Sequence, residues 1–163
     1  MTAGDRVRIL TRSRNIAMVG LSTHYFNAPS FAAIYLDANG YDIIPVNPVQ
    51  AGKAEILGRK VHATLADAAA EHPVEIVDVF RPSAEASDLA RQGVAISARV
   101  FWCQLGVLAD EAGRISTYGG RQVLMARRCR FVSARVLGGQ RSTARNPRLV
   151  TSSLSLSNRE AQD

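Results

Sequence analysis

The sequence has little cysteine and no long apolar run, and these absences narrow the classes of protein it can belong to. Its 163 residues include only 2 cysteines, Cys103 and Cys129. Two are too few for the disulfide framework of a small secreted domain, and their spacing matches no zinc pattern. No stretch approaches the ~18 apolar residues of a membrane-spanning helix, and residues 1–14 lack the apolar core of a signal peptide. We therefore expect a cytoplasmic protein with reduced thiols.

An even distribution of charge is also missing. The formal net charge is +6, but residues 121–163 hold 9 of the 20 Lys and Arg residues and only 2 of the 14 acidic ones. Residues 1–120 are therefore close to neutral, and the basic character belongs to the C-terminal tail. Residues 138–163 are rich in Ser, Arg and Asn, a composition typical of disorder. No DNA-reading helix-turn-helix is recognisable, and tail charge alone gives only salt-sensitive, non-specific affinity, which makes nucleic acid an unfavoured partner.

Short apolar runs alternate with longer amphipathic segments along the rest of the chain. The runs predict strands at residues 16–20, 41–47, 75–80, 99–104 and 121–125. They are continuously apolar, as expected for a parallel sheet covered by helices on both faces. Repeated strand–helix units predict an α/β fold with a Rossmann-like, doubly wound, mainly parallel five-stranded sheet. The predicted organisation is an N-terminal helix or extension at 1–14, a single domain at 15–137 and a basic tail at 138–163.

Residues 29–40 have the signals of a helix between the first two strands. Pro29 suits its first turn, and Gly40 is a plausible residue just past its end. The apolar residues at helical spacing, which predict one face, are Phe31, Ile34, Tyr35 and Ala38.

Two more helices are predicted from capping signals, and a fourth is expected near 109–117. Thr64 is expected to cap a helix over 64–71, with Asp67 in the capping-box position. Ser83 is expected to cap a helix that Gly93 ends. Residues 49–60, between the second predicted strand and the helix over 64–71, show no regular pattern.

The predicted topology indicates where a ligand would bind. In a doubly wound sheet the ligand lies at the carboxyl ends of the strands, near the point where the strand order reverses. Small, polar or chain-turning residues follow four of the strands, in the segments Gly20-Leu21-Ser22-Thr23, Pro45-Val46-Asn47-Pro48, Phe80-Arg81-Pro82 and Gln104-Leu105-Gly106. Gly20 would let the backbone approach a phosphate, with hydroxyls and helix N–H groups beside it. An isolated Gly20 turn capped by Ser22 would need no ligand, but four such strand ends together favour one.

The sequence lacks the motifs of the commonest phosphate-binding proteins. The G-x-G-x-x-G fingerprint is missing, because Ser22 and Tyr25 stand where the later glycines would fall. The second strand has its acid, Asp42, at its start rather than at the end that would meet an NAD ribose. A phosphate-bearing ligand other than NAD therefore fits better. Lys53 and Arg81 are the cations near the strand ends, and each is compatible with a ligand contact or with a solvated surface charge.

No catalytic or metal-binding arrangement is recognisable. His24, His62 and His72 lie in separate segments, without metal-ligand spacing or an acid at a partnering interval. We expect His62 and His72 to be exposed loop residues, and Asp78 to be a satisfied buried or edge carboxylate.

The aromatic residues of the fourth predicted strand and the two cysteines are first considered as structural residues. Phe101 and Trp102 are expected in the core, and Cys103 is expected to be an inert buried thiol, although it could lie at the mouth of the site. Cys129 lies among arginines that would lower its pKa if it were exposed. Mixed-disulfide chemistry with a ligand thiol is a minor hypothesis for it.

Five stretches in order resemble a known family. They are IAMVGLS, PSFAAIYLDANGYDIIPVNP, EILGRKVHATLADA, EIVDVFRP and FWCQLGV, within roughly residues 14–130. Together they resemble the CoA-binding domain family of small stand-alone bacterial and archaeal proteins, which is similar to the N-terminal domain of the succinyl-CoA synthetase alpha subunit. The resemblance implies that coenzyme A binds to Gly20, Leu21, Ser22 and Thr23, to the turn with Asn47, Pro48 and Lys53, and to Phe80-Arg81-Pro82 and Gln104-Leu105-Gly106. The second synthetase domain, with its phosphorylated histidine, has no counterpart, so ligase chemistry is not implied.

Three functional hypotheses follow. The leading one is a protein that binds coenzyme A or an acyl-CoA without catalysis of its own, as a carrier, a sensor or a subunit of an enzyme partner, and that can form a homodimer. The second is an enzyme, either an NAD(P)-binding oxidoreductase or half of a CoA ligase. The third is a nucleic-acid-associated regulator that acts through the basic tail.

The chain departs from the resemblance near its last predicted strand. Where the family has Met-Asp-Arg-Cys after the last strand, this chain has Met125-Ala126-Arg127-Arg128-Cys129.

Overall fold

The structure, a computed structural model, describes residues 3–24, 26–103 and 122–125. The helices are α1 (Ala3–Arg12), α2 (Ala28–Ala38), α3 (Leu65–Glu71) and α4 (Ser83–Ala95). The strands of the main sheet are β1 (Asn15–Val19), β2 (Asp42–Val46), β5 (Ile76–Val79), β6 (Val100–Cys103) and β7 (Gln122–Met125). None of the helices in these ranges is long and apolar enough to span a bilayer. The helix expected near 109–117 and the tail lie outside the described residues.

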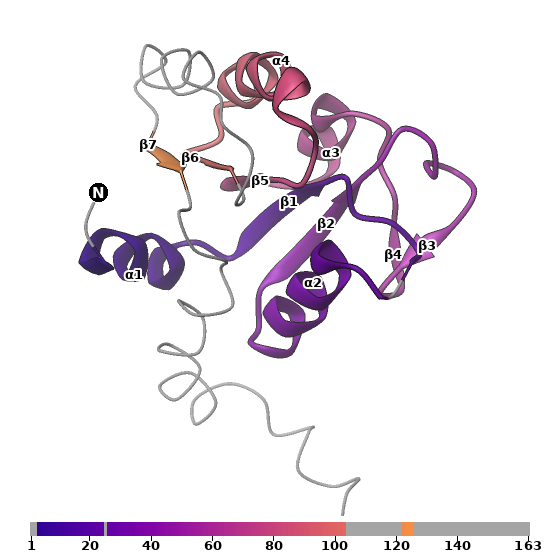
Figure 1. The fold of residues 1–163 in the computed structure, drawn as a ribbon, viewed down its shortest axis with the longest axis horizontal. Coiled ribbons are helices and arrows are strands. Elements are labelled where there is room, and N and C mark those ends of the chain that lie inside the picture. Colours follow the sequence, from indigo (N-terminus) through magenta and orange to yellow (C-terminus); the bar gives the residue numbers. More distant parts are fainter. Residues whose placement is uncertain (1–2, 25, 104–121, 126–163) are drawn as a thin grey trace, which may run out of the picture.

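The main sheet is parallel throughout and has the strand order β2-β1-β5-β6-β7, which confirms the predicted α/β fold (Figure 1). The chain passes from β1 to β2 on one side, then crosses back over β1 to continue through β5, β6 and β7 on the other. The order therefore reverses between β1 and β5. In open α/β sheets this is the place where a crevice forms at the carboxyl ends of the strands.

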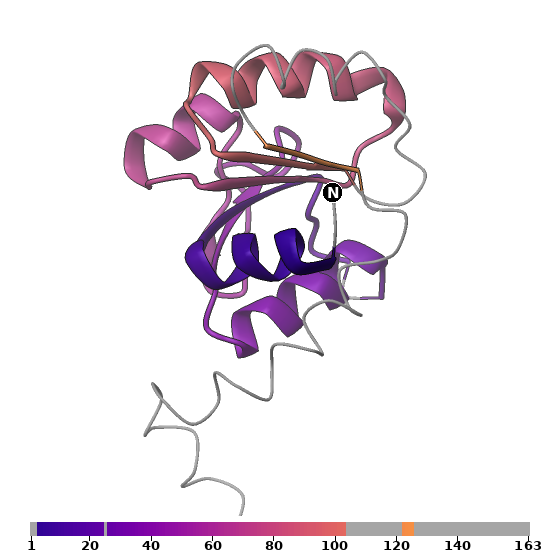
Figure 2. The ribbon, with the colours of Figure 1, turned by 90° about the vertical axis from the view of Figure 1, so that its left-hand side faces the viewer.

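Helices cover both faces of the sheet, with α1 and α2 on one side and α3 and α4 on the other (Figure 2). Each face has its own apolar core. Met18, Leu36 and Trp102 belong to the core under α1 and α2, whereas Val77 and Phe101 belong to the core under α3 and α4. Burial on both faces explains why the strands are continuously apolar in sequence. Asp78, Phe101, Trp102 and Cys103 are all buried, as expected.

Helix α2 starts and ends as predicted but buries a different face. Pro29 is in its first turn, and Gly40 follows the Asn39 C-cap with a φ of +82°. Phe31 and Ile34, which belong to the apolar face predicted from the sequence, are 49% and 43% exposed. The helix instead packs on the sheet through Ser30, Ala32, Ala33 and Leu36. Small side chains allow the helix to approach the sheet closely. The stabilisation from this close packing is greater than the stabilisation that burial of the larger apolar residues on the outer face would give.

The capping prediction is confirmed for α3 and wrong for α4. Thr64 accepts a hydrogen bond from the Asp67 N–H, and the Asp67 carboxylate accepts one from the Thr64 N–H, which is the predicted capping box. In α4 the N-cap position belongs to Pro82, and Ser83 is the first helical residue. Gly93 does not end α4 either, because the helix runs to Ala95.

A small antiparallel hairpin occupies part of the region that shows no regular pattern in the sequence. It consists of β3 (Glu55–Ile56) and β4 (Arg59–Lys60), joined by Leu57 and Gly58, which both have positive φ. The chain then continues beside β2 (Figure 1). The His62 N–H donates to the Pro45 carbonyl and the Asn47 N–H donates to the His62 carbonyl, both at 2.9 Å. His62 is only 2% exposed, so the expectation that it is an exposed loop residue is wrong, because this backbone pairing holds it against β2.

Gly93 offers a test of how α4 packs on the sheet. A Cβ at this position would lie 3.4 Å from Phe101 Cδ2 and 3.7 Å from Val77 Cγ2, which is ordinary contact. We expect Gly93→Ala to raise the free energy of unfolding by about 0.5–1 kcal/mol, because alanine restricts the unfolded chain and favours the helix. Gly93→Val, the larger control, should lower it by about 1–3 kcal/mol through overpacking. Urea denaturation measures both, and a loss of stability in Gly93→Ala would contradict this packing.

Candidate functional site

The segment after β1 turns sharply at Gly20 and lies against the segment after β5. Gly20 has a φ of +91°, and its N–H donates to the Val46 carbonyl at 3.0 Å. A Cβ here would lie 2.9 Å from Arg81 Cδ and 3.2 Å from the Phe80 carbonyl oxygen. Both the backbone conformation and the space therefore require glycine. The missing side chain allows the aliphatic part of Arg81 to pass directly over the end of β1.

Backbone donors follow this turn. The N–H groups of Leu21 and Ser22 donate to no residue in the part of the chain that the structure describes. The Ser22 Oγ accepts a hydrogen bond from Asn27 Nδ2 at 3.1 Å, and Asn27 caps α2 by accepting from the Ser30 N–H. The hydroxyl of Ser22 still has its proton to donate. Leu21 is fully buried whereas Ser22 is partly exposed, so the N–H and hydroxyl of Ser22 are the donors at the end of β1 that suit an anionic group near the start of α2.

The turn after β2 is joined to this loop by side chains. Asn47 Nδ2 donates to the Leu21 carbonyl at 2.9 Å, while its Oδ1 accepts from the Val49 N–H. The Gln50 side chain accepts from the Thr23 N–H at 3.1 Å and donates to the Thr23 hydroxyl at 3.3 Å. Thr23 is therefore engaged by protein, and Asn47 acts first as a brace for the loop. Gln50 has no recognisable signal in the sequence, because its partner is 27 residues away.

The two predicted cations differ in their surroundings. Arg81, just before the N-cap of α4, forms a bidentate ion pair with Glu85 in the first turn of that helix, through Nε at 2.9 Å and Nη2 at 2.8 Å. Lys53 is exposed, and its ammonium donates to the Val49 carbonyl at 3.2 Å. Arg81 is thus oriented and partly neutralised, whereas Lys53 is held only by a backbone oxygen and can turn toward a ligand.

The remaining predicted residues fall into two groups. Phe80 is half-buried against the core under α1 and α2, its N–H donates to the Val19 carbonyl at 3.0 Å, and Pro48 and Pro82 are exposed. Gln104, Leu105, Gly106 and Cys129 lie outside the described residues. The structure therefore brings together three of the four predicted segments, at the place where the strand order reverses.

Cys103 is a buried thiol, as expected. It is buried in the core under α3 and α4, and burial, with a smaller contribution from the negative charge of Asp78, raises the pKa of its thiol to about 11. The thiolate, which is the reactive form, is therefore scarce at neutral pH.

Comparison with known proteins gives matches over most of the chain. A family model described as "CoA binding domain" matches residues 14–134. The uncharacterized protein YneT of Bacillus subtilis is 37% identical over 117 residues, which are 72% of this chain and 83% of that protein. The solved structure of cell-free ID.343 from Thermus thermophilus is 29% identical, with a TM-score of 0.77 over 84% of this chain and 99% of that one. Prb, a PH1109 protein redesigned for binding, is 32% identical, with a TM-score of 0.77 over 85% of this chain and 94% of that one.

The contact between Gly20 and Arg81 can be tested with two glycine variants. Gly20→Ala should lower the free energy of unfolding by the ~1–2 kcal/mol of a left-handed backbone and by about 1–3 kcal/mol more from the clash. Gly40→Ala is the matched control, because Gly40 also has a positive φ, +82°, but a Cβ there would meet nothing within 4 Å. Urea denaturation of both variants isolates the clash. Equal losses of stability would show that Arg81 does not lie over the end of β1.

The burial of Cys103 predicts slow alkylation. In a Cys129→Ser variant, where Cys103 is the remaining thiol, iodoacetamide at pH 8 should react about 100-fold more slowly with the native protein than with the protein in denaturing urea, since thiolate and access are both lacking. Mass spectrometry over time measures the two rates. Similar rates would place the sulfur at the surface of the site instead.

Proposed function

The chain belongs to the CoA-binding domain family, and from this premise we propose that it binds coenzyme A or an acyl-CoA at the carboxyl ends of β1, β2 and β5. The observation that carries the proposal is the N–H group of Ser22, which has no acceptor among the described residues and follows Gly20, the residue over which Arg81 passes. This N–H, the Ser22 hydroxyl and a guanidinium suit the oxygens of a diphosphate. The diphosphate of coenzyme A would accept from them.

The ion pair of Arg81 with Glu85 means that a ligand phosphate would meet a guanidinium that already has an acidic partner. A ligand phosphate near Gly20 competes with Glu85 for Arg81, or shares the guanidinium with it, because the pair is about half exposed. Lys53 supplies a second positive charge from the turn after β2, without an acidic partner among the described residues. Together the two cations would balance part of the charge on the ligand.

The region around β2 supports coenzyme A over NAD. Its acid, Asp42, is the first residue of the strand and lies 3.9 Å from Arg59 Nη2, at the opposite end of the sheet from Gly20. At the carboxyl end, the Asn47 side chain is hydrogen-bonded to the backbone of Leu21 and Val49. No described residue there is an acid placed to hold a ribose diol in the way that NAD-binding sites do.

We propose a binding role without catalysis by the chain itself. Among the described residues of the site, the Ser22 hydroxyl is paired with the Asn27 amide rather than with a base, and Glu85 is paired with Arg81. Such a protein would serve as a carrier, as a sensor or as a partner subunit of an enzyme, with an enzyme or a second copy of the chain as its protein partner.

Calorimetric titration with coenzyme A, acetyl-CoA, NAD and ATP tests the ligand. We expect coenzyme A to bind in the micromolar range and NAD more weakly. Arg81→Ala should weaken coenzyme A binding by about tenfold or more, because a charged hydrogen bond contributes ~1.5–3 kcal/mol. Ser22→Ala should weaken it by a smaller factor. Heat with NAD but none with millimolar coenzyme A would refute the proposal.

Two further variants sharpen this experiment. Glu85→Gln removes the competitor of the ligand for Arg81 and should tighten binding of coenzyme A. Arg99→Ala is the matched control, because Arg99 pairs with Glu75 at the amino ends of the strands, away from the site. If Arg99→Ala weakens binding as much as Arg81→Ala does, the effect is one of overall charge and the assignment of Arg81 fails.

A further inference from the structure

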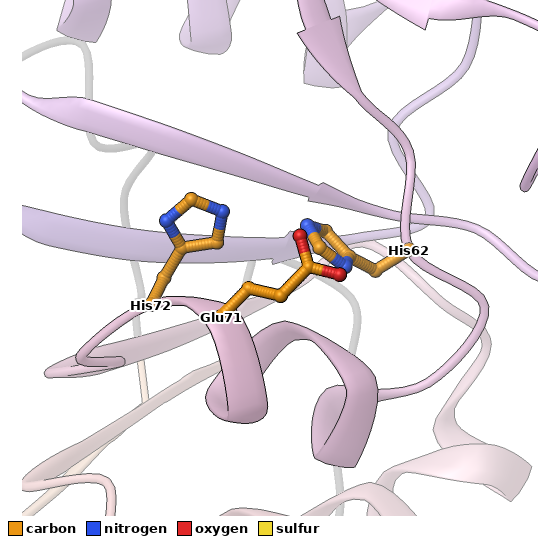
Figure 3. A group of neighbouring side chains, drawn as sticks. All are labelled: His62, Glu71 and His72. Atoms are coloured by element: carbon orange, nitrogen blue, oxygen red, sulfur yellow. The ribbon is translucent and has the colours of Figure 1, made fainter.

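The His62 side chain meets those of the neighbouring residues Glu71 and His72 beside the carboxyl end of β2. His62 follows β4, Glu71 is the last residue of α3, and His72 is the C-cap of the same helix. One nitrogen or oxygen atom from each lies within 4.8 Å of those from the other two. Figure 3 shows the Glu71 carboxylate and the two imidazole rings turned toward a common space. The spacing of these residues along the chain, which resembles no metal-binding motif, gives no sign of this cluster.

The burial of His62 leaves one of its atoms without a partner. Its Nδ1 is buried and has no hydrogen bond in the part of the chain described. The ring contacts that of His72 edge to face, with centroids 5.4 Å apart, so packing holds it in place without satisfying the nitrogen. An unsatisfied buried polar atom destabilises the folded protein and requires an explanation, of which a bound ion is one.

The chemistry of the cluster suits a particular class of ion. Two imidazoles and one carboxylate are the protein ligands of many zinc sites in which a water completes the coordination, whereas magnesium and calcium prefer oxygen alone. Burial lowers the pKa of His62, which favours the neutral imidazole that coordinates metals. The ammonium of Lys60 lowers the pKa of Glu71 through its hydrogen bond to Oε1, which favours the carboxylate.

We propose that His62, Glu71 and His72 bind a divalent transition-metal ion of the zinc class. Metal–ligand distances of about 2.0–2.2 Å require the three atoms to draw closer together than they are here. Glu71 and His72 are exposed and lie at the end of α3, so their side chains can make this movement around a fixed His62. Lys60 competes with the metal for Glu71, since the two are paired.

Titration with Co²⁺ and Zn²⁺ tests the site in an untagged chain that carries Cys129→Ser, so that the thiol of Cys129 does not contribute. We expect one Co²⁺ per chain, with visible absorption of a low-coordinate site and no thiolate band. His72→Gln should weaken binding at least about tenfold. His24→Gln is the matched control, because His24 is an exposed histidine elsewhere on the chain, and it should leave binding unchanged. No stoichiometric Co²⁺ binding, or equal weakening in the two variants, overturns the proposal.

Two more measurements separate a metal site from a merely packed cluster. Zn²⁺ should raise the melting temperature of the parent chain in a concentration-dependent way, and His72→Gln should abolish this shift. Lys60→Met should tighten Co²⁺ binding several-fold, because it removes the cation that competes for Glu71. Unchanged or weaker binding in Lys60→Met contradicts the role given to Glu71. The coenzyme A titrations do not bear on these outcomes, since the cluster shares no residue with that site.

Discussion

Strand β1 is paired on both sides and buried on both faces, and each part of the candidate site is fixed relative to it. Its neighbours β2 and β5 are both parallel to it, so their carboxyl ends meet at one edge. Backbone hydrogen bonds continue this pairing past the strand ends, from Gly20 to Val46 and from Phe80 to Val19. The carboxyl ends of β1 and β5 therefore meet where the strand order reverses, which is the place where open α/β sheets bind ligands.

Much of the fold could be predicted because its signals are local. Continuous apolar runs mark the strands, and Thr64 with Asp67 marks the start of α3 within four residues of sequence. The errors arise where packing decides. The role of Gly93 in α4, and the choice of which face of α2 is buried, both depend on how closely the helix approaches the sheet. The hairpin of β3 and β4 was missed because its strands are two residues long and because Leu57, at a φ of 54°, is an unusual residue for its turn.

The site was predictable as a set of segments but not as a set of contacts. Topology rules applied to the sequence are enough to place Gly20, Asn47 and Arg81 at one edge of the sheet. They do not reveal that Gln50 holds Thr23, or that Glu85 is paired with Arg81, because Arg81 lies before the N-cap of α4 and helical spacing does not predict this contact. They also cannot place His62, since its burial depends on pairing with a strand that ends sixteen residues earlier.

The same pairing of His62 has a consequence for how copies of the chain can associate. Strand β2 is an edge strand, and exposed edges invite another chain to add a strand. Here Pro45 has no N–H to offer, its carbonyl is taken by the His62 N–H, and the Asn47 N–H is taken by the His62 carbonyl. The carboxyl half of this edge is closed to intermolecular β-pairing. A partner strand would have to add elsewhere on the sheet, so this half of the edge is protected from uncontrolled growth into aggregates.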